Sequence, residues 1–169
     1  MADMTQTHPA PLSEEEVSAL FAQLEELIPQ VEQAAADDAR VQRARQAAQI
    51  FPVAEELRKA RILLDSQLAD LEAEKRAVRQ AQADGDANAA GFHGFKLKSI
   101  GEQVDFAKAP VQRAEQVLED MIAHSPFASW EEAQSALMDE EECQRLAAHA
   151  EAVRQEYARV FNLCSAYAE

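Results

Sequence analysis

The sequence is poor in aromatic residues and glycine, and each shortage narrows the class of protein. Aromatic side chains make up 6% of the 169 residues, although hydrophobic residues make up 47%. Much of that hydrophobic fraction is alanine, which favours helix but buries little area. We therefore expect a thin interior made by helices packing on helices rather than a thick globular core.

Long apolar runs are also missing. No stretch approaches the ~20 apolar residues that a membrane helix needs. Residues 1–12 lack the basic start and apolar centre of a secretory signal. We expect a cytoplasmic protein without a membrane partner. Its two cysteines, Cys143 and Cys164, fit that compartment as reduced thiols, because one helix would hold them roughly 31 Å apart.

Basic residues are scarce, with 16 against 31 acidic ones and a net charge of −15. Residues 1–39 contain nine acidic and no basic residues, whereas residues 40–83 contain nine basic and six acidic ones. Residues 114–169 are acidic again, with twelve acidic and three basic residues. This balance disfavours direct binding of nucleic acid. Two interpretations stay open: internal pairing between the segments, or an acidic surface for a basic partner.

Motifs for catalysis and metal binding are not found. The four histidines are scattered, and none follows a glutamate at the spacing of a di-iron bundle. Residues 84–86 open like a calcium loop, but Ala89 and Phe95 stand where that loop needs glycine and glutamate. No nucleophile elbow or phosphate-binding glycine loop is present. We predict that the protein is not an enzyme and holds no cofactor or metal.

The apolar periodicity predicts an all-α fold, either a long-helix bundle or a coiled-coil-like hairpin. We assign residues 1–12 to a disordered tail and residues 13–169 to a single helical domain. The expected helices cover 13–49 with a kink at Pro29, 52–83, 110–124 and 129–168. Capping boxes at Ser13 and Ser129 mark two of the helix starts. Asp139 either caps a separate final helix or lies within a continuous one.

Two stripes of apolar residues predict packing seams. One recurs every seven residues from 57 to 78, and the other alternates steps of three and four from 143 to 167. Such registers are typical of helices that pack along one narrow face. The predicted seam residues are Leu57, Leu64, Leu71, Val78, Cys143, Leu146, Ala150, Val153, Tyr157, Val160, Cys164 and Tyr167.

All four glycines fall between Gly85 and Gly101, which predicts a flexible interruption over residues 84–109. Alternating apolar and polar residues there admit a small β-hairpin at 92–106. Aromatic and cationic side chains in and near this loop form our candidate interaction site. The candidates are Phe92, His93, Phe95, Lys96, Lys98 and Trp130. Alternatively, the phenylalanines fold back to plug the end of the bundle, and Trp130 is a packing anchor.

These observations favour a non-enzymatic interaction protein, with an adaptor, regulatory or assembly role, that acts through apolar helix faces. Its partner would be another protein, which a basic surface would suit, or a second copy of itself. One alternative is an acidic inhibitor or decoy that imitates nucleic acid and occupies a basic surface. A second alternative is an enzyme or metal carrier whose site is assembled from distant residues.

Overall fold

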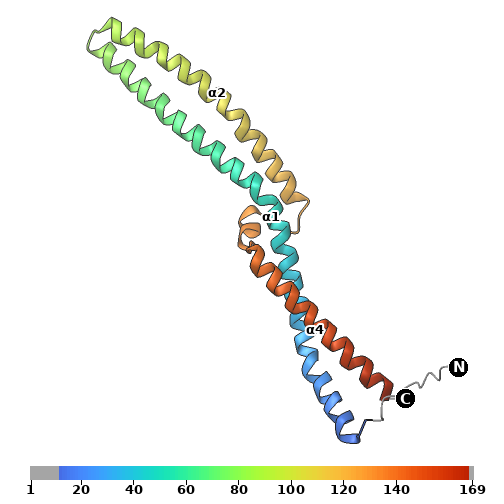
Figure 1. Cartoon of the computed structure of the whole chain (residues 1–169). Helices are drawn as coiled ribbons and strands as arrows, with labels where there is room; N and C mark the ends of the chain where they lie inside the picture. Colours follow the sequence, from blue (N-terminus) through green and yellow to red (C-terminus); the bar gives the residue numbers. More distant parts are fainter. Residues whose placement is uncertain (1–11, 168–169) are drawn as a thin grey trace, which may run out of the picture. The chain divides into compact units, whose positions relative to one another are not determined.

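The structure is a computed structural model that describes residues 12–167. Over that range it is all-α, as the sequence predicts (Figure 1). Its elements are α1 (Glu14–Ala83), α2 (Ala87–Ala123), α3 (Trp130–Ser135) and α4 (Glu140–Tyr167). The predicted tail lies outside the described residues apart from Leu12. No helix within residues 12–167 is long and apolar enough to cross a membrane.

The contacts divide the chain into two compact units, whereas the sequence suggested one helical domain. Unit 1 contains residues 1–42 and 138–169, and unit 2 contains residues 43–137. The long helix α1 contributes its first part to unit 1 and its remainder to unit 2. Each unit is therefore built on a separate stretch of the same helix.

Helix α1 begins at a complete capping box. The amide of Ser13 donates to Glu16 Oε2 over 2.7 Å, and the amide of Glu16 donates to Ser13 Oγ over 3.3 Å. The helix then continues for 70 residues, so the predicted boundary between residues 49 and 52 is wrong. Pro29 and Pro52 are both exposed. Water can therefore solvate the carbonyl groups that each proline leaves without a backbone donor.

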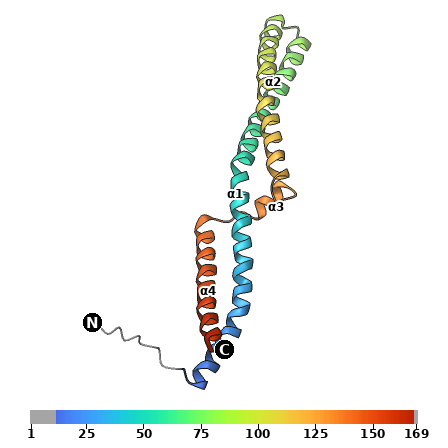
Figure 2. The same ribbon diagram turned by 90° about the vertical axis from the view of Figure 1, so that its right-hand side faces the viewer.

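In unit 1, α4 lies beside the first part of α1 (Figure 2). Small and branched side chains fill the contact in two clusters. One cluster joins Leu27 of α1 to Val160 and Cys164 of α4. The other joins Ala34 of α1 to Ala150 and Val153. Alanine at both partners brings two helices close, which explains how a sequence poor in large side chains still buries an interface.

In unit 2, the remainder of α1 and α2 form an antiparallel hairpin (Figure 1). Leu57 packs with Val111 and Ala114 in one buried cluster. The turn between the helices is made at Gly85, whose φ of 72° is the left-handed conformation that glycine adopts without strain. Asp86 then caps α2 by accepting the amide of Ala89 over 2.9 Å.

The predicted loop at 84–109 and the β-hairpin at 92–106 are wrong, because α2 covers nearly all of this segment. Gly91, Gly94 and Gly101 lie inside the helix. Each glycine costs about 1 kcal/mol relative to alanine. Packing of neighbouring residues on α1 outweighs that cost, as at Val104 and Ala107, which are both buried. The helix expected from residue 110 therefore begins 23 residues earlier.

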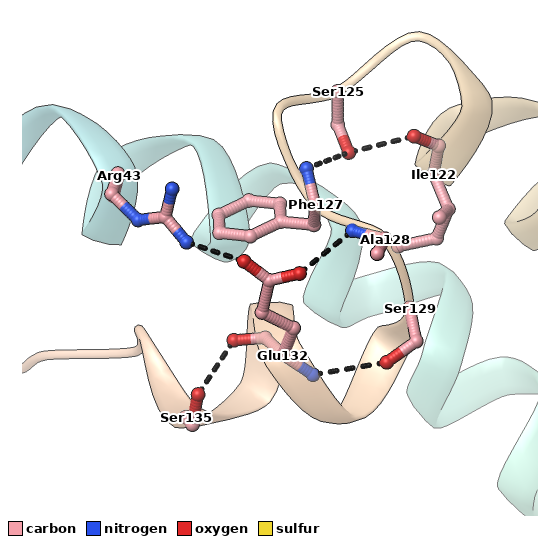
Figure 3. Close-up of polar contacts among 8 residues, drawn as sticks. All are labelled: Arg43, Ile122, Ser125, Phe127, Ala128, Ser129, Glu132 and Ser135. Atoms are coloured by element: carbon pink, nitrogen blue, oxygen red, sulfur yellow. Dashed lines mark hydrogen bonds and ion pairs between the residues drawn. The ribbon is translucent and has the colours of Figure 1, made fainter.

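The short helix α3 is held to α1 and to the loop that precedes it by polar contacts (Figure 3). Glu132 accepts Arg43 Nη2 over 2.7 Å and the amide of Ala128 over 2.8 Å. Ser129 Oγ accepts the amide of Glu132 over 3.2 Å, as the predicted cap requires. The guanidinium of Arg43 also lies 4.9 Å from the centre of the Phe127 ring. Helix α3 ends at Ser135, so α4 is a separate helix capped by Asp139.

Candidate interaction surface

Two phenylalanines of the predicted site project into solvent from α2. Phe92 is 62% exposed and Phe95 is 74% exposed. The alternative in which both rings fold back to plug the end of a bundle is therefore wrong. Exposed aromatic side chains are costly in solubility and are enriched in contact sites. Lys98 is exposed on the same helix.

His93 and Lys96 contact both Phe92 and α1: the His93 ring centre lies 5.5 Å from that of Phe92, and Lys96 Nζ lies 5.7 Å from the centre of the Phe92 ring. His93 Nδ1 lies 2.7 Å from Glu74 Oε2, and Lys96 Nζ donates to Glu74 Oε1. These contacts lower the pKa of Glu74 below its usual range, with the Lys96 hydrogen bond as the larger cause and the His93 bond next. Both residues thus hold the hairpin together, and sequence reasoning did not anticipate that role.

A third phenylalanine, Phe106, is the most exposed of all at 84%. It lies two heptads after Phe92, so both rings project from the same side of α2. Phe106 was not among the predicted site residues, because its segment was expected to be a loop with a possible small β-hairpin. Continuing in steps of three and four gives a row that we call the α2 stripe. The α2 stripe consists of Phe92, Phe95, Ser99, Gln103, Phe106, Pro110 and Arg113.

Two shallow hollows follow the α2 stripe where it meets α1. The first hollow, of about 400 Å³, is lined by Leu63 and Gln67 of α1 and by Ser99, Gln103 and Phe106 of α2. The second hollow, of about 210 Å³, adds Val53, Ala60 and Val117. Pro110 lines both hollows. The stripe and the hollows therefore lie along one side of the hairpin, where apolar side chains are interspersed with polar ones such as Glu102 and Gln103.

The hairpin buries little of itself around this side. Within 58–103, a stretch that the structure describes in full, Ala81 is the one fully buried residue. The carbonyl oxygen Oε1 of Gln67 is buried beside the first hollow without a hydrogen-bond partner in residues 12–167. Such an atom costs about 1–3 kcal/mol when nothing satisfies it. This side of the hairpin is therefore thinly packed around Gln67.

Trp130 contributes to packing rather than to the exposed surface. Its ring centre lies 6.3 Å from that of Phe51, and the side chain packs against the buried cluster of Ala47, Ile50 and Phe127. The partly buried indole is thus the packing anchor that the sequence analysis gave as the alternative. Its neighbour Phe51 remains 42% exposed.

The residues of the two predicted seams face their neighbours to different degrees. In the hairpin, Leu57 is buried, and Leu64, Leu71 and Val78 are half-buried. On α4, Tyr157 is half-buried and Tyr167 is exposed. The fully buried members of α4 are Cys143, Leu146, Ala150, Val153, Val160 and Cys164. Both cysteines are free thiols that act as small apolar side chains.

Within residues 12–167, no three His, Cys, Asp or Glu side chains gather as a metal ion would require. The surface instead offers aromatic rings and aliphatic side chains bordered by single charges. Over residues 12–167 the fold is all-α, with α1 packing on α2 in one unit and on α4 in the other. Comparison with protein-family models, curated proteins and solved structures found no significant match.

Proposed function

We propose that this protein is a non-enzymatic association protein that binds a helix of a partner along the apolar side of the α1–α2 hairpin. One observation carries the proposal: Phe92, Phe95 and Phe106 are exposed together on α2. At about 200 Å² for each aromatic side chain, they leave on the order of 400 Å² of apolar area in water. That is within the range of functional patches on monomeric proteins, roughly 300–600 Å².

The hollows explain why a helix suits this side. They form a groove between two parallel ridges, and the side chains of a third helix pack into such grooves. Leu63 and Phe106 stand on opposite walls of the first hollow. A partner that places an apolar side chain between them would remove both from water.

The test is photo-crosslinking in the cells that make the protein. A benzophenone-bearing phenylalanine analogue replaces Phe106 in the full-length chain. In a control chain it replaces Arg79, which is exposed on α1 and lines neither hollow. We expect a protein adduct from position 106 and none from position 79. No adduct at 106, or equal adducts at both positions, would contradict the proposal.

A second proposal concerns unit 1, where the negative charge is concentrated. Its described residues contain fourteen acidic and four basic side chains. Those four arginines are already paired with carboxylates of the same unit. The remaining carboxylates would attract a basic partner, as an acidic inhibitor or decoy does. The same crosslinker at Glu26 tests this idea: an adduct with a basic protein that salt abolishes is expected, and no adduct would reject it.

A further inference from the structure

We propose that the occupant of the α2 stripe is a second copy of this chain, with the two α2 helices antiparallel about a twofold axis between Glu102 and Gln103. This inference rests on the proposed function and names its partner. A twofold contact uses the same patch on both chains. If residue i of one chain contacts residue j of the other, then residue j of the first chain also contacts residue i of the other. The stripe must therefore be complementary to its own reverse.

The spacing of the α2 stripe meets that requirement. Reversing the stripe about the proposed axis places Phe92 against Arg113 of the second copy, and Phe95 against Pro110. Ser99 then meets Phe106. An arginine facing a phenylalanine ring is a favourable cation–π pair, and a proline ring gives an aromatic ring an apolar contact. The three phenylalanines of the stripe each meet a smaller or complementary side chain, whereas Gln103 meets Glu102 of the second copy and the two Glu102 side chains flank the axis.

The first hollow offers space for a side chain of the second copy. Ser99 lines the hollow, together with Leu63 and Gln67 of α1. Phe106 of the second copy, which meets Ser99 in this register, would enter that hollow. The projecting ring on each chain is thus matched to the hollow beside a small residue on the other. Side chains from one helix fill holes on its neighbour in the same way in coiled coils.

Charges at the edge of the stripe are also complementary to their own reverse. Lys98 and Asp105 lie seven residues apart, so they project from the same edge of α2. In the antiparallel pair, Lys98 of each chain and Asp105 of the other lie on the same edge of the contact, about 3 Å apart along the helix axis. Lys98 takes part in none of the ion pairs within residues 12–167, whereas Asp105 is paired with Lys108 of its own helix over 2.8 Å and would exchange or share that partner. Two symmetric ion pairs would therefore flank the contact.

Net charge and area also favour a second copy. Unit 2 carries 12 basic and 15 acidic residues, so two such units meet with little repulsion despite the total charge of −15. A stable interface buries about 800 Å² on each partner. The three exposed phenylalanines supply roughly half of that area. Leu63 and Val117, which are 55% and 42% exposed on the same side, add to it.

A charge swap tests the pairing on the purified full-length protein by sedimentation equilibrium up to about 100 µM. We expect a dimer for the natural chain. Lys98→Asp alone and Asp105→Lys alone should each raise the dissociation constant about tenfold or more, because like charges then face each other twice. The double variant should return to within about threefold of the natural chain. Arg79→Asp, an equally exposed charge change outside the stripe, should leave dimerisation unchanged.

The outcomes separate this inference from the proposed function. A monomer at the highest concentration, with another protein crosslinked at position 106, overturns the second copy but keeps the association surface. A dimer in which the double variant is not rescued overturns the antiparallel pairing of α2. The melting temperature of each variant checks that the protein still folds. We expect no change, because both Lys98 and Asp105 are exposed. Rescue by the double swap supports the inference directly.

Discussion

His93 Nδ1 on α2 lies 2.7 Å from Glu74 Oε2 on α1, and Lys96 bonds to the other oxygen of the same carboxylate. This contact links the two arms of the hairpin where apolar burial is low. We predict that Glu74→Gln lowers the melting temperature more than Glu72→Gln does. Glu72 is a good control because its ion pair, with Lys75, lies within its own helix. An equal loss in the two variants, measured by circular dichroism, would show that the cross-helix contact adds nothing.

The same carboxylate makes the stability of the hairpin depend on pH. Hydrogen bonds from Lys96 and then His93 lower the pKa of Glu74 in the folded protein. In the unfolded chain the Glu74 carboxyl group has the ordinary glutamate pKa of about 4.3. It therefore binds its proton at a higher pH in the unfolded chain than in the folded protein. The stability that the Glu74 carboxylate adds to the folded protein is fully present above that pH. It is lost as the pH falls through the pKa of Glu74 in the folded protein. We expect the difference in melting temperature between the natural chain and Glu74→Gln to shrink steadily below about pH 4.3.

Replacing glycine by alanine should lower the free energy of unfolding at the turn but raise it inside α2. Gly85 adopts a φ of 72°, so Gly85→Ala should destabilise the protein by about 1 kcal/mol or more. Gly91 and Gly101 lie inside α2, and an added Cβ would meet no atom within 4 Å. Alanine at either position should stabilise by about 0.5–1 kcal/mol. Urea denaturation measures both effects, and stabilisation by Gly85→Ala would contradict the turn assignment.

This contrast shows where sequence reasoning failed in the fold. Glycine and proline are weak indicators of structure, since tertiary packing can outweigh a cost of about 1 kcal/mol for each glycine. Gly91, Gly94 and Gly101 were therefore mistaken for a loop, and Pro110 for a helix start. The helix through these residues is stabilised by contacts with α1, such as those at the buried residues Val104 and Ala107. The local sequence does not contain those contacts.

The candidate site was predictable in part for a related reason. Phe92 and Phe95 are recognisable as aromatic residues in an otherwise aromatic-poor segment. Phe106 became visible only when the segment was assigned to a helix, because its spacing from Phe92 is meaningful at a helical period and not at a strand period. His93 and Lys96 could not be placed, since their partner Glu74 lies about 20 residues away across a turn.

The contact between α1 and α4 in unit 1 should depend on apolar burial at Val153. Val153 is buried with Ala34 and Ala150, and its steps of three and four from neighbouring apolar residues were legible in the sequence. Val153→Asp would bury an unpaired carboxylate at a cost of about 3 kcal/mol or more. Ala152→Asp places the same charge on the adjacent exposed position and should change stability by less than about 0.5 kcal/mol.

Urea denaturation of the two variants decides between packing and charge as the cause. If added negative charge on an already acidic unit were the main problem, both variants would lose similar stability and high salt would restore both. If packing dominates, only Val153→Asp is destabilised and salt restores little. We expect the second result, because the helices approach closely through alanine at residues 34 and 150 and leave no room to hydrate a carboxylate at 153. A salt-sensitive loss shared by both variants would mean that electrostatics, rather than apolar burial, governs this helix pair.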